Sequence, residues 1–486
     1  MNEFEDLKVL LHSRSPLIVI ESFEEPRALL LLKRLAMNLM RPIFKWTITE
    51  GLQRFDTEQG AQAFNAEPSN LLAQIKGTRN SGIYVLCDFH PFLNDAKHIR
   101  YLKEIAQAHE QLGHTVILLS HALQIPPELS RFCYSFSLSL PSDQQIRQLI
   151  QDAADNYIAH TGMPAQLTEQ SISLLLPHLR GLTFDEVKRL AYKAIADDGA
   201  LTGDDIPRLN KAKFNLLQQD GVLSQVFEPV TLNDVIGLDN LKAWLEQRRS
   251  AFLSQHSDTP KGLLLTGVQG SGKSLAAKAV AGHWQVPLLR LDMAALYNKY
   301  IGETEKNLRQ ALTLADAMSP CVLWVDEIEK GLSLDDSDNG VSRRLLGSLL
   351  TWMAERKSRV FLVATANNIH DLAPELLRKG RFDEIFFVDL PDVAQRKALL
   401  QYHLAKRKAG LAEDDINLAA ACSDGFSGAE LEQAVVGAGF RARSAERQLI
   451  ADDLLSELKA TQPLSVVMAE QVQALRLWAQ QRCVQA

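Results

Sequence analysis

The 486-residue chain contains only five cysteines, little net charge and no long apolar run. The cysteines are odd in number and lie far apart without a C-x-x-C pair, so we expect reduced thiols and a cytoplasmic protein. A net charge of −7 argues against a dedicated nucleic-acid or membrane-surface binder, although it leaves room for a local basic channel. Since no stretch approaches the roughly 18 apolar residues of a membrane helix, no membrane partner is expected.

A glycine-rich turn follows an apolar stretch in LLLTGVQGSGKSLAAKAV, residues 263–280. It fits the pattern G-x-x-x-x-G-K-[ST]. Glycines let the backbone curl around a polyphosphate, a helix start adds its positive dipole end, the lysine reaches the outer phosphates and the serine hydroxyl can ligate Mg²⁺. The alternative is a chance turn between a strand and a helix. The predicted nucleotide-binding residues here are Gly267, Gly270, Ser271, Gly272, Lys273, Ser274 and Leu275, with Ser274 also a metal ligand.

An acidic pair ends the apolar run in CVLWVDEIEK, residues 321–330. Ligands gather at the carboxyl ends of buried parallel strands, where Asp326 and Glu327 are expected to lie. We predict that Asp326 binds the nucleotide and its Mg²⁺, and that Glu327 polarises the attacking water as a general base. The alternative is an acidic pair that caps the next turn.

Two further segments carry polar groups suited to phosphoryl transfer. Asn367 follows the apolar strand in RVFLVATANN and could orient water and contact the γ-phosphate, or could be a turn asparagine. Arg378 and Arg381 lie in LLRKGRF, and a guanidinium can stabilise the charge that develops during transfer. If this loop lies across the sheet from Lys273, the arginines would reach a neighbouring subunit's nucleotide, which implies a ring or stack of like subunits. A surface salt-bridge pair is the alternative.

These four segments, in this order and at this spacing, resemble the AAA+ ATPases, and in particular the clade that includes ring-shaped unfoldases. The resemblance covers about residues 227–443. FEPVTLNDVIGLDNLKAWL is similar to the clade's entry segment, which implies that Ile236 and Gly237 flank the adenine. SDGFSGAELEQAVVGA is similar to its lid helix, which implies that Gly428 and Ala429 pack near the nucleotide.

The resemblance also implies roles for the remaining polar groups. Asn367 corresponds to the first sensor, and Arg378 and Arg381 correspond to paired arginine fingers. YNKYIGETEKNLR is similar to the first pore loop, which implies that Tyr300 and Ile301 grip a client. A homo-oligomer of six subunits is implied as well. The missing H-E-x-x-H motif excludes the membrane-protease branch.

The whole chain looks closest to the hypothetical chloroplast reading frame forty-six family of plastids, cyanobacteria and other bacteria. This resemblance implies the plastid stroma as the location if the protein is organellar. The expected fold class is α/β: a P-loop AAA+ parallel sheet with a helical lid, preceded by a degenerate AAA-like α/β module.

The degenerate module is predicted from a repeat in the order of the segments. PLIVIESFEEPRALLLLKRL aligns with the phosphate-loop segment, and SGIYVLCDFH aligns with PCVLWVDEIE, which puts Asp88 at the position of Asp326. RGLTFDEVKRLAYKA aligns with DGFSGAELEQAVVGA. The alternative is that all α/β sheets look somewhat alike. The predicted domains are the degenerate module at 1–203, a linker helix at 204–226, the large ATPase subdomain at 227–391, and the lid with a C-terminal helix at 392–486.

The first module has lost the phosphate loop. Glu21, Glu24 and Glu25 are located where glycine amides should meet phosphate, and their carboxylates would repel it. Pro26 removes an N–H group and Phe89 replaces the catalytic glutamate. We therefore expect a module that neither binds nor hydrolyses ATP, and that stabilises a ring or recruits a client.

The expected activity is Mg²⁺-dependent hydrolysis of ATP, with ATP and Mg²⁺ as cofactors. The predicted use is the remodelling or translocation of a macromolecular client, a protein in preference to RNA. The alternative is a nucleotide-dependent switch on RNA or a ribonucleoprotein, with Lys299, Arg343 and Arg344 as basic groups. The complete acidic strand and both arginines argue against a scaffold with negligible turnover.

Overall fold

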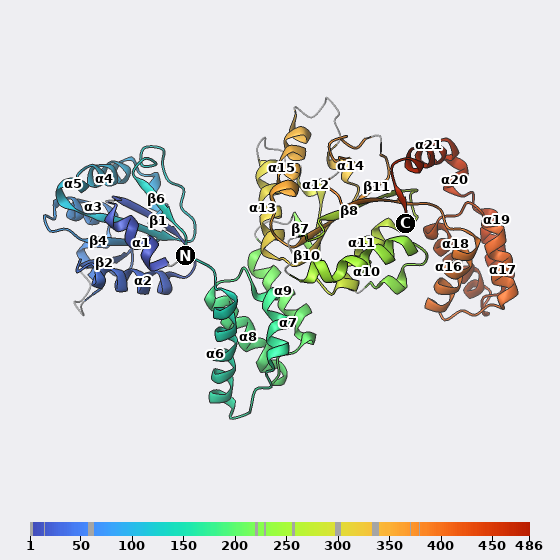
Figure 1. Cartoon of the computed structure of the whole chain (residues 1–486), viewed down its shortest axis with the longest axis horizontal. Helices are drawn as coiled ribbons and strands as arrows, with labels where there is room; N and C mark the ends of the chain where they lie inside the picture. The colour runs from blue at the N-terminus through green and yellow to red at the C-terminus, as the bar shows by residue number, and fades with distance from the viewer. Residues whose placement is uncertain are drawn as a thin grey trace. The chain divides into compact units, whose positions relative to one another are not determined.

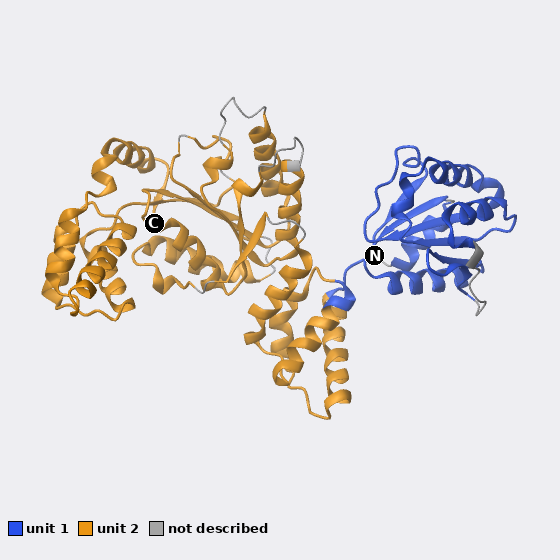
Figure 2. Ribbon diagram, turned by 180° about the vertical axis from the view of Figure 1, so that it is seen from behind, with its two compact units in different colours: residues 1–142, 183–186 blue, residues 143–182, 187–486 orange. Residues whose placement is uncertain are grey.

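A computed structural model gives the fold and describes residues 3–13, 15–56, 63–218, 222–227, 230–254, 258–296, 303–332, 340–369, 371–378 and 380–486. The chain divides into two compact units, residues 1–142 with 183–186 and residues 143–182 with 187–486 (Figure 2). The predicted pore-loop residues Tyr300 and Ile301 lie outside the described residues. Within the described ranges, no helix combines the length and apolar character needed to cross a membrane.

The first unit contains a six-stranded sheet between two layers of helices (Figure 1). Its strands are β1 (Leu17–Glu21), β2 (Ile43–Thr47), β3 (Gly51–Arg54), β4 (Ile83–Cys87), β5 (Thr115–Ser120) and β6 (Cys133–Phe136). One face packs on α1 (Glu3–His12) and α2 (Glu25–Asn38), and the other on α3 (Pro68–Gly77) and α4 (Ala96–Gln107), with α5 (His109–Leu112) next along the chain. Every residue of β4 and β5 is buried, as expected for parallel strands covered on both faces.

A helical segment follows the first sheet. Its helices are α6 (Asp143–Thr161), α7 (Glu169–Leu179), α8 (Phe184–Asp198), which begins in the first unit, and α9 (Ile206–Leu217). Phe214 of α9 belongs to the apolar core of the second sheet. Next to it, the buried Lys213 donates a 2.6 Å hydrogen bond to the carbonyl of Arg180, and burial lowers the pKa of Lys213 to about 8. The segment predicted as a linker helix, 204–226, contains α9 and also β7 (Leu223–Val226), which joins the second sheet.

The second sheet has seven strands. They are β7, β8 (Gly262–Gly267), β9 (Leu288–Leu291), β10 (Cys321–Val325), β11 (Val360–Ala366), β12 (Glu384–Val388) and β13 (Val484–Gln485). One face packs on α10 (Asp239–Leu253) and α11 (Lys273–Trp284), and the other on α13 (Glu303–Ala317) and α15 (Val341–Glu355). Two short helices, α12 (Met293–Leu296) and α14 (Ile328–Gly331), follow β9 and β10. The stacked rings of Phe252 and Trp284, 4.7 Å apart, join α10 to α11, the helix that begins at the phosphate loop.

The two sheets share one strand order. Five parallel strands lie in the order β6-β1-β5-β4-β2 in the first sheet and β12-β8-β11-β10-β9 in the second. Each order reads fifth, first, fourth, third, second along the chain. An antiparallel strand, β3 or β7, is added beside the second of the five in each case. The shared strand order agrees with the repeat of segments in the sequence, which did not itself specify the order of the strands.

The lid is a separate helical cluster with its own apolar core. It consists of α16 (Val393–Lys406), α17 (Glu413–Cys422), α18 (Gly428–Ser444) and α19 (Ala451–Ala460). The chain then passes through α20 (Leu464–Val467) and α21 (Ala469–Gln480) to β13, which pairs with β12. Arg476 of α21 donates hydrogen bonds of 2.8–3.0 Å to Asp389, directly after β12. The end of the chain therefore packs at the edge of the large-subdomain sheet.

Candidate nucleotide site

The glycines between β8 and α11 are required for different physical reasons. A Cβ atom on Gly267 would lie 2.0 Å from the carbonyl oxygen of Val388, so the contact between β8 and β12 requires glycine whatever the loop binds. At Gly272 the φ angle is 97° and an added Cβ would meet no described heavy atom within 4 Å. At residue 272 it is therefore the backbone conformation, and not close packing, that favours glycine.

Lys273 is the first residue of α11 and is only 5% exposed. Its ammonium group donates 2.8 Å hydrogen bonds to the carbonyls of Gly267 and Val268. Burial lowers the pKa of Lys273 to about 8, although the carboxylates of Glu329, Asp326 and Glu327 act in the opposite direction. The loop thus holds a cation away from water, where the approach of a polyanion is strongly favourable.

Three elements meet at Asp326, which follows β10. Its Oδ1 atom accepts hydrogen bonds from the hydroxyl of Ser274 on α11 at 3.1 Å and from that of Thr365 on β11 at 2.6 Å. The Thr365 hydroxyl also accepts a 3.0 Å hydrogen bond from the backbone N–H of Glu327. Thr365 therefore fixes both acidic residues relative to the neighbouring strand.

Glu327 is held by groups on either side. It has a left-handed φ of 49°, and its Oε1 accepts a 2.8 Å hydrogen bond from the side-chain amide of Asn367. Its Oε2 forms a 2.5 Å ion pair with the exposed Lys330. The backbone N–H of Asn367 in turn donates to Glu329 at 2.9 Å. Glu329 is 5% exposed, and burial raises the pKa of its carboxyl group.

A cavity of about 430 Å³ lies where these groups converge, within the range of small-molecule sites. The backbone N–H of Ala429 at the start of the lid helix α18 donates to the carbonyl of Gly270 at 3.2 Å, which ties the lid to the loop. Of the residues predicted from the sequence, the cavity is lined by Ile236, Gly270, Ser271, Gly272, Lys273, Ser274, Leu275, Asp326, Glu327, Asn367, Gly428 and Ala429.

Four predicted residues lie outside this lining. Gly267 is beneath the loop, and a Cβ on Gly237 would lie 2.7 Å from Nε2 of Gln395, which does line the cavity. Arg378 is exposed, and the Arg381 guanidinium donates to the carbonyl of Glu375 in its own loop. Neither arginine therefore contacts this cavity in the described structure.

Thr365, Glu329 and Lys330 were not predicted from the sequence as residues of the site. The signal for Thr365 was a hydroxyl residue within the apolar run before Asn367. The signals for Glu329 and Lys330 were a third acid and a base that follow the acidic pair after one apolar residue. Other lining residues that were not anticipated are Asp234, Gln395, Tyr402, His403 and Glu432.

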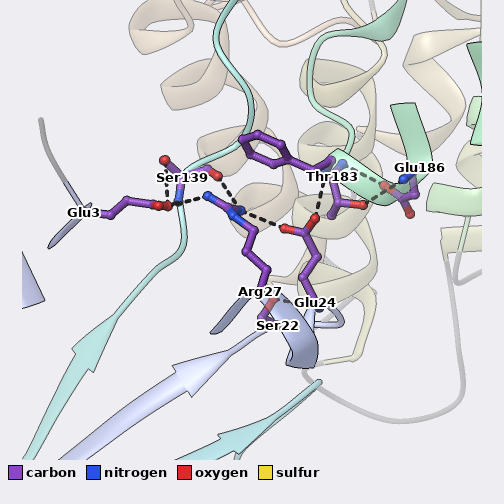
Figure 3. A network of polar contacts seen from close by, with 8 residues as sticks. Glu3, Ser22, Glu24, Arg27, Ser139, Thr183 and Glu186 are labelled. Carbon is purple, nitrogen blue, oxygen red and sulfur yellow. Dashed lines mark hydrogen bonds and ion pairs between the residues drawn. The ribbon is translucent and has the colours of Figure 1, made fainter. Parts of the chain in front are cut away.

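The matching corner of the first unit carries its own ion pair (Figure 3). Glu24, 4% exposed, accepts a 2.8 Å hydrogen bond from the backbone N–H of Phe184, at the start of α8. Its other oxygen pairs with Arg27 at 2.8 Å, and Arg27 also binds Glu3 at 2.7 Å. The guanidinium carbon lies 4.1 Å from the centre of the Phe184 ring. Glu24 thus binds the first N–H group of α8, and Arg27 neutralises the charge of the Glu24 carboxylate.

Comparisons with known proteins identify the class. A family model described as "ATPase family associated with various cellular activities (AAA)" matches residues 263–390. The N-terminal and second domains of SpoVK-like AAA ATPases match residues 4–138 and 144–220. The AAA domain-containing protein ycf46 of Guillardia theta is 35% identical over 490 residues, covering 99% of this chain and 95% of that protein. The chain belongs to the ycf46 family of AAA ATPases.

Two further relatives show how this similarity extends. The ycf46 protein of Pyropia yezoensis is 35% identical over 489 residues, covering 99% of this chain and 98% of its own. The proteasome-activating nucleotidase of Aeropyrum pernix is 37% identical over 211 residues, covering 42% of this chain and 51% of its own. The family, the P-loop AAA+ fold and the ATPase activity predicted from the sequence are therefore confirmed. The predicted domain boundaries stay a prediction.

The first prediction for this ycf46-family ATPase concerns Thr365. Thr365→Val keeps the shape of the side chain but removes the hydroxyl that binds Asp326 and the Glu327 N–H. We expect the turnover rate to fall roughly 10- to 100-fold, as for other groups that orient catalytic ligands. Steady-state ATPase assays check this, with Thr365→Ser as the matched control that keeps the hydroxyl. Equal turnover by the two variants would contradict the assigned role.

A second prediction concerns pH. An anion stabilises the charged form of Lys273, so bound nucleotide raises a pKa that is about 8 in the free site. Below pH 8 the ammonium is already charged, whereas above it binding must take up a proton. Nucleotide affinity should thus fall as pH rises from 8 to 9.5, by at most about tenfold per pH unit. Isothermal titration calorimetry measures this, and an affinity independent of pH in that range would refute it.

Proposed function

We propose that this ATPase binds Mg-ATP in the cavity between the loop, the acidic strand and the lid. We further propose that a ring of like subunits, six by family resemblance, uses hydrolysis to remodel or translocate a macromolecular client. The observation that carries the proposal is the convergence of Lys273, the Ser274–Asp326–Thr365 hydrogen bonds and the Glu327–Asn367 pair on one cavity. A cytoplasmic or stromal location is part of the proposal.

The proposed roles follow from the donor groups. The N–H groups from Gly270 to Ser274 and the Lys273 ammonium bind phosphates. Ile236, Gly428 and Ala429 surround the base, with Gly237 next to the lining residue Gln395. Ser274 and Asp326 suit Mg²⁺ because they offer hard oxygen ligands 3.1 Å apart. The ion would neutralise charge on the phosphates.

Water activation is assigned to Glu327 in this proposal. Its carboxylate accepts the proton of the attacking water, and Asn367 holds Oε1 in position through the 2.8 Å hydrogen bond. The other carboxylate oxygen of Glu327, Oε2, forms the ion pair with Lys330. Lys330 must release that oxygen when Glu327 acts as a base through it, so the pair opposes turnover.

The position of Arg378 and Arg381 supports a ring. Arg378 and Arg381 lie outside the cavity of their own chain, and arginine fingers supplied by a neighbour would stabilise charge in the transition state. A head-to-tail contact of this kind closes into a ring when its rotation permits.

A protein client is favoured over RNA. The proteasome-activating nucleotidase, a relative by sequence, is named for an activity on a protein complex. By family resemblance Tyr300 and Ile301 correspond to a pore loop, and an aromatic residue beside an aliphatic one suits a polypeptide of any sequence. The exposed Arg343 and Arg344 on α15 support the RNA alternative. Binding through them would weaken steeply with salt.

The proposal is tested with Glu327→Gln, which should bind ATP and stall hydrolysis. We expect this variant to elute with ATP as an assembly of 54.1 kDa chains and to retain polypeptides from its native lysate. The added substitution Tyr300→Ala should release the polypeptides without dissolving the assembly. The matched control is Glu327→Gln with Lys273→Ala, which removes the phosphate-binding cation.

Three outcomes would overturn parts of the proposal. A monomer with bound ATP would refute the ring. Retained RNA that nuclease or high salt releases would replace the protein client with the RNA switch. Polypeptides retained equally by the Lys273→Ala control would mean that capture does not depend on nucleotide.

A further inference from the structure

The carboxyl edge of the first sheet carries a cluster of metal-ligating side chains. Asp88 follows β4, His121 follows β5, and His90 begins the short 3₁₀ turn after Asp88 (His90–Asn94). One ligand atom from each lies within 4.8 Å of the others. We propose that these three residues bind a divalent transition-metal ion of the zinc type. The proposal does not depend on the role of the nucleotide cavity, because all three residues belong to the first unit.

The spacing suits such an ion after small side-chain rotations. Bonds from zinc to nitrogen or oxygen are about 2.0–2.2 Å long, so ligand atoms in a tetrahedral site lie about 3.4 Å apart. Closing the cluster requires each ligand atom to move by roughly an ångström, which side-chain torsions supply without a change of backbone.

The hydroxyl of Ser120, the last residue of β5, orients two of the ligands. It donates a 3.1 Å hydrogen bond to Oδ1 of Asp88 and lies 2.8 Å from Nδ1 of His90. A hydroxyl has a single proton, so Nδ1 of His90 must be the donor to Ser120. Nε2 of His90 is then the ring nitrogen with a free lone pair, which is the form in which imidazole binds metals.

The third ligand, His121, is positioned by residues at and after the end of β1, where the second unit has its phosphate loop. The His121 ring stacks on Phe23 with centroids 5.6 Å apart, and Phe23 follows β1. Glu21 at the end of β1 accepts a 3.0 Å hydrogen bond from the N–H of Leu123, which fixes the chain just after His121. The rings of His90 and His121 lie 4.9 Å apart at 86°. The cluster is thus supported by three neighbouring strands.

The donor set selects the type of ion. Two imidazoles and one carboxylate suit Zn²⁺ and its neighbours in the first transition series, whereas Mg²⁺ prefers oxygen ligands alone. Three protein ligands leave a fourth position for water or for a side chain of another molecule. Asp88 and His121 are exposed, so an ion can enter from solvent.

The test uses the full chain, freed of metal by a chelator and without nucleotide or Mg²⁺. Calorimetry with Zn²⁺ should give one site per chain that Mg²⁺ does not occupy, and Co²⁺ should give the visible absorption of a tetrahedral site. His121→Ala and Asp88→Asn should each raise the Kd for Zn²⁺ at least tenfold. His160→Ala, an exposed histidine of α6, is the matched control and should leave that Kd unchanged.

Two results would overturn the proposal. One is the absence of saturable Zn²⁺ binding at micromolar concentration. The other is binding that His121→Ala leaves unchanged, since the ion would then occupy other side chains. Circular dichroism of each variant guards against misfolding, and an unfolded His121→Ala protein would move the test to Asp88→Asn.

Discussion

The buried ammonium group of Lys273 is the constraint on which the nucleotide corner depends. A lysine that is 5% exposed loses most of its hydration, and two loop carbonyls and three nearby acids offset only part of that loss. The carbonyls are available because Gly267 and its neighbours turn the chain back above α11. The acids lie close to Lys273 because only β11 separates β10, which they follow, from β8. Sheet order, glycine positions and the charge on Lys273 therefore have to be considered together.

The corresponding position of the first unit holds a buried carboxylate where the second unit holds a buried cation. The helices α8 and α18 begin with the same capping box, Thr183 with Glu186 and Ser427 with Glu430. In the second unit Gly428 and Ala429, the first two residues of α18, line the nucleotide cavity. In the first, the carboxylate of Glu24 takes the N–H group of Phe184. The Glu24 carboxylate would repel a polyphosphate there, and the neighbouring cation, Arg27, is already paired with Glu24 and Glu3. This is the physical basis for expecting a single nucleotide per chain.

Much of the fold and the cavity could be predicted from the sequence because the motifs end strands. Asp326 and Asn367 directly follow apolar runs, and parallel strands bring such positions to one edge of the sheet. The hydrogen bonds of Thr365 could not be predicted in this way, since a hydroxyl group in an apolar run does not indicate which neighbouring residue it will bind. The two-residue strand β13 was also unpredictable, because its pairing with β12 depends on a contact about a hundred residues away in sequence.

The central claim is that one chain has one working nucleotide site and one that is closed by its own ion pair. Equilibrium dialysis of Glu327→Gln with ATP and Mg²⁺ measures the number of nucleotides per chain directly. The account predicts one at saturation, and none once Lys273→Ala is added. Two nucleotides per chain, or one that persists with Lys273→Ala, would contradict it.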